Sequence, residues 1–253
     1  MDYDELLNVS VELGCQLMFS GAEIYRVEES VRRLLQAYGL ESPEVFAIPN
    51  CVIVSITTPE GHPITRMRRI AGHGTDIELL ERCNALCRQL CVQPPPVAEA
   101  KAILASLPDG TPQYASWQVL LGYGIAPAFF SPLFGGGIPD MLAAFFGGLG
   151  VGLCLLYGKR LIGTNSFFQT AICSAAASLL SLMLVRLGLG HSIDTVTISV
   201  LMVLVPGVSL TNSMREIMAG DIISGLIRAA GSILTAAAIA IGTAVGLTIG
   251  WMI

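Results

Sequence analysis

The sequence predicts an α-helical polytopic membrane protein of about five transmembrane helices, preceded by a small cytoplasmic α+β domain. Hydrophobic residues make up 53% of the chain and charged residues only 13%, about half the charged share of a soluble domain. The first 114 residues hold nine basic and fifteen acidic side chains, and the rest hold five and four. The nearly uncharged part contains apolar stretches long enough to span a bilayer. We therefore expect a cytoplasmic domain over 1–112 and a transmembrane domain over 113–253.

The N-terminal domain is expected to stay in the cytoplasm. The opening residues, MDYDELLNVSVELGCQ, are acidic and amphipathic, whereas a secretory signal needs a basic region followed by an apolar core. The seven cysteines are odd in number and two lie in apolar stretches, which argues against a disulfide framework. Cys83, Cys87 and Cys91 repeat every four residues. They either begin a zinc site or pack as small apolar residues on one helix face; the lack of a CxxC pair favours packing.

Four helices and a small sheet are expected in this domain. Apolar periodicity predicts a helix over 3–19. A second helix begins at 20–24, with Ser20 or Gly21 as its cap and Glu23 in its first turn, and it ends before Gly39. The segment 44–70 is rich in Val, Ile and Thr and predicts two or three strands, with a hairpin around Gly61. Further helices are expected over 74–90, capped by Thr75 or Asp76, and after the PPP at 94–96. His62 and His73 are interpreted as surface residues.

The apolar half contains five candidate spans, over 115–134, 138–157, 166–186, 193–210 and 222–250. Pro127 and Pro132 interrupt the first span, and the fourth ends at Pro206-Gly207. Lys and Arg are more frequent in loops on the side of the N-terminal domain, which predicts an inside N-terminus and an outside C-terminus. An odd number of spans is difficult to reconcile with an internal twofold duplication of this chain alone. We therefore expect a partner membrane subunit.

Glycines in two spans predict close helix packing. Gly148 and Gly152 lie four apart in the second span, and Gly242, Gly246 and Gly250 form a ladder in the fifth. Small residues at this spacing let two helix backbones approach. The ladders serve either packing within the chain, which we favour, or contacts in a higher oligomer.

The stretch NSMREIMAGDIISGLIR at 212–228 places charges between two apolar runs. In a continuous helix Asp221, Ser224, Gly225 and Arg228 would share one face, so that the two opposite charges offset each other. One interpretation is a broken-helix binding site, in which the polar groups of Thr211, Asn212 and Ser213 take part. The other is a cytoplasmic loop, in which Arg215 and Glu216 simply face water. Asp140, Asp194 and His191 lie at predicted outer span edges and are weaker candidates.

Two stretches resemble motifs of the threonine/serine exporter family. They are SGAEIYRVEES (20–30) and LVPGVSLTNSMREIMAGDIISGLIRA (204–229), in the order found in that family. The resemblance covers essentially the whole chain. It implies a secondary transporter that exports small hydrophilic metabolites across the inner membrane. Because the chain stops after the fifth span, it resembles the first subunit of the split, two-protein form, which is linked to threonine/serine or succinate export and needs a second small membrane subunit.

The resemblance also implies site residues. The first motif contributes Glu23, Arg26 and Glu28, which form either a capped helix with an intrahelical ion pair or a gate at the cytoplasmic mouth. The second motif contributes the following residues: Pro206, Gly207, Asn212, Arg215, Glu216, Gly220, Asp221, Ser224, Gly225 and Arg228.

The chemistry of these side chains suggests roles in binding a small polar substrate. Arg215 or Arg228 would pair with a carboxylate, since a guanidinium fork matches that geometry. Asp221 or Glu216 would take a proton or hold an amine. Coupling to the proton gradient predicts that export by Asp221→Asn loses its pH dependence.

Other classes of function have less support in the sequence. We expect no metal and no organic cofactor. The alternative function is a membrane-anchored sensor that binds a ligand with its cytoplasmic domain. The known catalytic and phosphate-binding motifs are absent, which argues against an enzyme, and the lack of a basic patch argues against nucleic acid as a partner.

Overall fold

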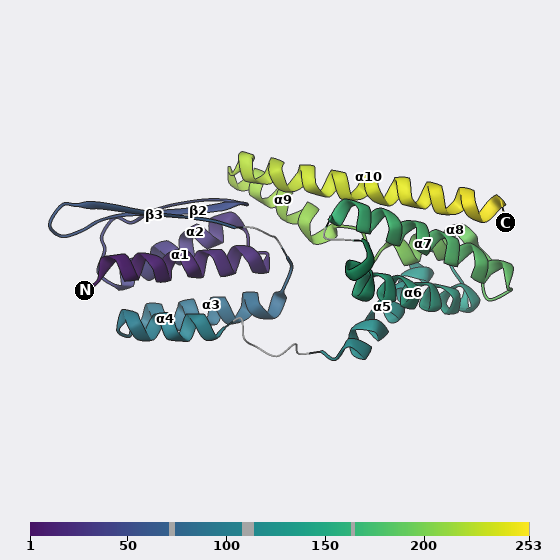
Figure 1. Ribbon diagram of the computed structural model, residues 1–253, viewed down its shortest axis with the longest axis horizontal. Helices are drawn as coiled ribbons and strands as arrows, with labels where there is room; N and C mark the ends of the chain where they lie inside the picture. The colour runs from purple at the N-terminus through teal and green to yellow at the C-terminus, as the bar shows by residue number, and fades with distance from the viewer. Residues whose placement is uncertain (71–73, 108–113, 163–164, 253) are drawn as a thin grey trace. The chain divides into compact units, whose positions relative to one another are not determined.

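The computed structural model describes residues 1–70, 74–107, 114–162 and 165–252 (Figure 1). The chain packs into two compact units, Met1–Thr111 with Leu210–Ala229 and Pro112–Ser209 with Ala230–Ile253, which we call the first and second units. Helices α9 (Gly207–Ala219) and α10 (Ile222–Met252) contribute residues to both. His73 and the predicted domain boundary at 112/113 lie outside the described residues.

The first unit combines helices with one antiparallel sheet, as predicted. The sheet has the order β1-β2-β3, and the turn between β2 and β3 contains Gly61 with a positive φ of 86°. Figure 1 shows the sheet, the pair α1 and α2, and the pair α3 and α4 as three successive layers. The elements are α1 (Tyr3–Ser20), α2 (Ile24–Ala37), β1 (Glu44–Ile48), β2 (Cys51–Thr57), β3 (Pro63–Arg69), α3 (Ile77–Val92) and α4 (Val97–Ser106).

The core of the first unit forms around α1, which contacts both the sheet and the α3–α4 pair. Leu6, Leu13 and Leu17 of α1 are fully buried, because a helix in a middle layer meets other elements on opposite sides. Cys83 and Cys87 of α3 are buried in the same core, and Cys91 packs against it. The predicted packing role of these three cysteines is therefore confirmed.

The turn between α1 and α2 differs from the expectation. Helix α1 ends at Gly21, which takes a left-handed φ of 99°, a conformation that costs glycine little. Helix α2 begins at Ile24 with Glu23 at the N-cap position, and the side chain of Glu23 does not cap it. The prediction that Ser20 or Gly21 caps this helix is therefore wrong; the Ser20 hydroxyl donates to the Leu17 carbonyl.

The second unit contains helices long and apolar enough to cross a membrane. Four such helices occur in the described part of the chain: Ser116–Phe134, Ile138–Gly158, Ser166–Arg186 and Ile222–Met252. They correspond to α5 (Ser116–Phe130) with the 3-10 turn η1 (Ser131–Phe134), to α6 (Ile138–Ile162), to α7 (Ser166–Arg186) and to α10.

The expected fourth span, 193–210, is not one continuous helix. Helix α8 (Ile193–Leu201) has nine residues and is roughly 14 Å long, about half of the hydrocarbon thickness. A turn follows, and α9 starts at Gly207. Pro206 explains the break, because it has no N–H to donate and disfavours helical backbone in the residue before it.

Asp140 connects the starts of two helices in the second unit. Its carboxylate accepts hydrogen bonds from the backbone N–H groups of Gly137, His191 and Ser192 at 3.2, 2.7 and 3.0 Å. The start of α6 therefore lies beside the start of α8. The end of α7 is close to the same level, because Arg186 is separated from α8 only by a short loop.

The α8–α9 segment runs from this end of the second unit toward the other. Gly242 of α10 faces Ala171 of α7, and Gly246 faces Ala175, so that α7 and α10 run in the same direction. The hydroxyl of Ser232 donates to that of Ser209 at 3.1 Å. Ser232 precedes Gly242 by about 15 Å of helix, whereas Ser166, the first residue of α7, precedes Ala171 by about 7.5 Å, so Ser232 lies beyond the start of α7. Helix α9 thus begins near the end opposite Asp140.

The glycine ladders are used within the chain, as we favoured. A Cβ atom added to Gly148 or Gly152 would overlap α5 at Tyr123, and one added to Gly242 or Gly246 would overlap backbone atoms of α7. Because these glycines have no side chain, α6 can pack closely against α5, and α10 can pack closely against α7.

Candidate functional site

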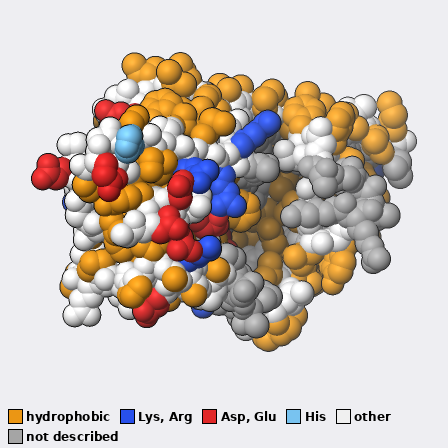
Figure 2. All heavy atoms as spheres, turned by 60° about the vertical axis from the view of Figure 1, so that its left-hand side comes forward, with side chains coloured by type: hydrophobic (Ala, Val, Ile, Leu, Met, Phe, Trp, Pro, Cys, Tyr) orange, Lys and Arg blue, Asp and Glu red, His pale blue; other side chains and the backbone are white. Residues whose placement is uncertain are grey.

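The two sequence motifs meet inside the first unit. Residues 210–219 of α9 and the first two turns of α10 pack with the turn between α1 and α2. We call the contacting residues the motif junction, and they are Ala22, Glu23, Ile24, Arg215, Glu216 and Arg228. Figure 2 shows acidic and basic side chains side by side on the face of the molecule that comes forward.

Glu216 is fully buried in the motif junction, with none of its surface exposed. Its Oε1 accepts a hydrogen bond from the backbone N–H of Ile24, the first residue of α2, at 3.2 Å. The first N–H groups of a helix have no partner within the helix, and the helix N-terminus favours negative charge. Glu216 therefore supplies from α9 the cap that Glu23 does not provide.

Arg228 joins both sides of the motif junction. Its Nε lies 3.2 Å from Oε1 of Glu216 as an ion pair, and its Nη2 donates to the carbonyl of Ala22 at 2.8 Å. Asp221 directly precedes the first residue of α10, and its carbonyl accepts the N–H of Gly225 at 3.0 Å. Asp221 and Arg228 therefore keep the helical spacing that the sequence indicated, and the offset of their charges stays a prediction.

Glu23 pairs with two arginines. Its Oε1 accepts from Nη1 of Arg215 at 3.1 Å, and its Oε2 accepts from Nη1 of Arg26 at 3.3 Å. The Arg26 contact is the intrahelical pair that the first motif predicted, and the Arg215 contact joins Glu23 to α9 as well. The interpretation that Arg215 and Glu216 both face water is wrong for Glu216. It holds only for the side chain of Arg215, which is 63% exposed.

Burial raises the pKa of the Glu216 carboxyl above its ordinary value, and the nearby carboxylates Asp221 and Glu23 add to this, while Arg228 and the N–H of Ile24 oppose it. Oε2 of Glu216 has no hydrogen-bond partner in the described part of the chain. A proton on this oxygen would remove the buried charge and weaken the ion pair with Arg228. Glu216 can therefore take up a proton more readily than an exposed glutamate.

The charge of Asp221 affects the pKa of Glu28. Burial raises the pKa of Glu28, and Asp221 contributes to the rise, whereas the N–H of Ala47 and the charge of Arg32 lower it. Oε1 of Glu28 accepts from the Ala47 N–H at 2.8 Å. Glu28 thus connects α2 to the edge of the sheet.

Small residues let α9 and α10 approach each other beside the motif junction. A Cβ atom on Gly225 would overlap Ile217 and the carbonyl of Ser213, and Gly220 turns the chain between the helices with a φ of 102°. Ser213 and Ser224 are buried, and the Ser213 hydroxyl donates to the Leu210 carbonyl. These predicted site residues support the helix pair.

The remaining predicted residues lie away from these contacts. Thr211 is exposed and Asn212 half-buried on α9, while Pro206 and Gly207 belong to the second unit. Sequence reasoning missed Ala22 and Ile24, which take part through backbone atoms. The sequence signal for their position was the turn of small residues at 20–22 between the helices α1 and α2. Across the described ranges, no three His, Cys, Asp or Glu side chains are placed to hold a metal ion.

A family model described as "Putative threonine/serine exporter" matches residues 8–250. Over 251 residues the chain is 26% identical to the "Probable succinate transporter subunit YjjP" of Escherichia coli, which covers 96% of this chain and 95% of that protein. No solved structure matches the chain.

Two longer relatives have names that refer to amino acid export. The "Probable threonine/serine exporter" of Mycobacterium tuberculosis is 24% identical over 96% of this chain and 46% of its own length. The "Threonine/serine exporter" of Corynebacterium glutamicum is 23% identical over 96% and 50%. The chain thus spans about half the length of these two relatives and almost all of the Escherichia coli protein. The family match covers both motifs and both units: the chain belongs to the threonine/serine exporter family.

Proposed function

We propose that the chain is one subunit of a secondary transporter that exports small hydrophilic metabolites across the inner membrane. The substrate class is threonine/serine-type amino acids or dicarboxylates such as succinate, which the names of its relatives support. A second small membrane subunit completes the exporter. Two observations support this second subunit. A relative of nearly the same length is named a subunit, and two relatives named as exporters are about twice as long as this chain.

The chain crosses the membrane five times in this proposal, with its N-terminus in the cytoplasm and its C-terminus outside. Four crossings are the long apolar helices. The fourth in chain order is the segment 193–210, which comprises α8, the break and the first residues of α9. The contacts of Asp140 at its start and of Ser209 near its other end support it. Broken helices whose irregular backbone lines a cavity are common in secondary transporters. The break at Pro206 therefore suits a solute pathway.

The motif junction acts as the gate that couples the cytoplasmic domain to the membrane helices. The observation that supports this most is the capping of α2 by Glu216, which lies in a helix that continues into the second unit. The guanidinium group of Arg215 is exposed, so it can release the carboxylate of Glu23 and bind a carboxylate of the substrate instead. A proton on Glu216 would weaken its pairing with Arg228, so proton uptake and opening of the junction would be linked.

Efflux from cells tests the exporter. Cells preloaded with labelled threonine, serine or succinate would express this chain alone, the second subunit alone, or both. We expect efflux of one label only when both proteins are present. If no label leaves the cells although both proteins are in the membrane, the proposed substrate class is wrong.

A further inference from the structure

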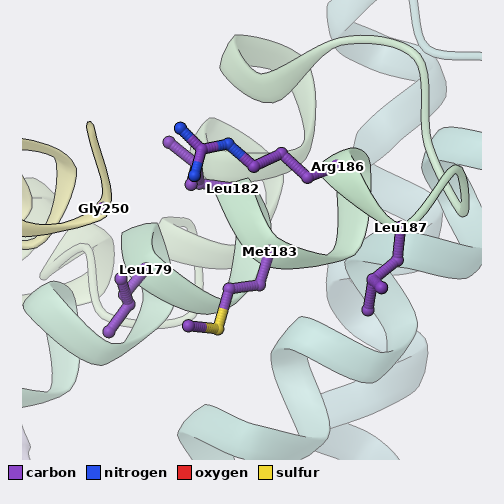
Figure 3. A pocket seen from close by; sticks show the side chains of 6 residues that line it. All are labelled: Leu179, Leu182, Met183, Arg186, Leu187 and Gly250. Atoms are coloured by element: carbon purple, nitrogen blue, oxygen red, sulfur yellow. The ribbon is translucent and has the colours of Figure 1, made fainter. Parts of the chain in front are cut away.

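A hollow of about 290 Å³ lies between the ends of α7 and α10 in the second unit (Figure 3). Its walls are aliphatic apart from one guanidinium group, which Figure 3 shows extending beside Leu182. The residues that line it are Leu179, Leu182, Met183, Arg186, Leu187 and Gly250.

Gly250 is the reason that α10 leaves room here. An added Cβ at this position would lie 3.2 Å from Leu179 and from Leu182, so a larger residue would press on the wall of the hollow. Leu187 and Met183 are exposed on the outer side. The hollow is therefore open toward the surroundings of the bundle, which for a membrane protein are lipid chains.

The position of the hollow matches the level of lipid headgroups. Arg186 is the last residue of the apolar helix Ser166–Arg186, and Trp251 is near the end of α10. The Arg186 guanidinium lies 5.9 Å from the centre of the Trp251 ring, within the range of a cation–π contact. Tryptophan and arginine at helix ends anchor proteins in the interfacial region of a bilayer.

The positive charge of Arg186 is available to bind an anion. Among the described residues no carboxylate forms an ion pair with it. A guanidinium fork binds a phosphate through two parallel hydrogen bonds. Basic pockets between spanning helices bind anionic lipid headgroups in this way.

We infer that this hollow is a binding site for an anionic phospholipid. The phosphate pairs with Arg186, and one acyl chain lies along Leu179, Leu182 and Met183. This inference does not depend on the exported substrate.

Trp251 provides the readout. The chain has two tryptophans, so Trp117→Phe leaves Trp251 as the only one. This variant would be placed in nanodiscs of phosphatidylcholine that contain a small fraction of brominated phosphatidylglycerol, or the same fraction of brominated phosphatidylcholine. Bromine quenches tryptophan fluorescence only at short range, so quenching reports the lipid that occupies the site.

We expect the brominated anionic lipid to be enriched about five-fold at Trp251, which corresponds to the contribution of one arginine near a lipid headgroup. Arg186→Gln should remove the preference, Arg186→Lys should keep part of it, and the control Arg33→Gln in α2 should not change it. Equal quenching by the two lipids would overturn the inference. So would a preference that survives Arg186→Gln, or quenching that disappears when the second subunit is added.

Discussion

Loss of Glu216 tests the motif junction most sharply. Glu216→Ala removes the cap of α2, worth about 0.5–2 kcal/mol, and leaves Arg228 in a buried setting without its carboxylate. Removing one partner of a buried ion pair costs about 3–5 kcal/mol. The two effects arise from one side chain and overlap, so we expect the free energy of unfolding to fall by about 3–5 kcal/mol.

A double-mutant cycle separates the pair from the cap. Arg228→Ala should cost a similar amount, and the double variant should cost much less than the sum, with a coupling energy of about 2–3 kcal/mol. The free energies can be measured by pulse proteolysis across a denaturant series in mild detergent, which cleaves only the unfolded fraction.

The pair Glu29 and Arg33 provides a matched control. Both side chains are on α2 and largely exposed, and such helical pairs contribute about 0.3–0.5 kcal/mol. A coupling energy between Glu216 and Arg228 as small as that of the control pair would refute the argument that this buried contact holds the two motifs together.

Three further predictions concern Glu216, Gly246 and Asp140. The raised pKa of Glu216 means that the folded protein binds a proton more tightly than the unfolded chain does. The free energy of unfolding should therefore decrease as pH rises above 4.5, the ordinary pKa of glutamate. Glu216→Gln should flatten this pH dependence between pH 4.5 and neutrality, and a variant whose free energy of unfolding changes with pH as in wild type would contradict the prediction. Gly246→Ala should destabilise the α7–α10 pair by about 1–3 kcal/mol, whereas Gly231→Ala, where no atom is near, should be neutral or stabilising in the same denaturation assay. Asp140→Asn should lower the unfolding temperature because three N–H groups share the carboxylate, while Asp194→Asn on the exposed side of α8 should not; equal shifts would disprove the role of Asp140.

Periodicity in the sequence was sufficient to find most elements. The apolar spacing of α1 and α2, the Val-rich strands with a glycine turn, and the long apolar runs each produce a local pattern. The span expected at 193–210 was predicted in part. Pro206-Gly207 marked its end in the sequence, but α8 already ends at Leu201, and the apolar residues between them give no local signal for this earlier break.

The motif junction could be predicted only in part. Both motifs are visible as charged stretches, yet Glu216 and Ile24 are 192 positions apart, and no local pattern specifies such a contact. Helix spacing pointed to Asp221 as a neighbour of Arg228, but it gave no sign of the ion pair between Arg228 and Glu216. Gly220 turns the chain between α9 and α10, and this turn brings the two side chains together.

The most direct test of the gate is the rate of export by a variant of the motif junction. Cells that express both subunits would be preloaded with the labelled substrate, and initial efflux would be compared among wild type, Arg215→Gln and the control Arg33→Gln, at equal amounts of protein in the membrane. Arg215 is exposed, so its replacement should cost little stability. We predict that Arg215→Gln reduces export at least ten-fold while Arg33→Gln exports like wild type. Unchanged export by Arg215→Gln would contradict a gate at the motif junction.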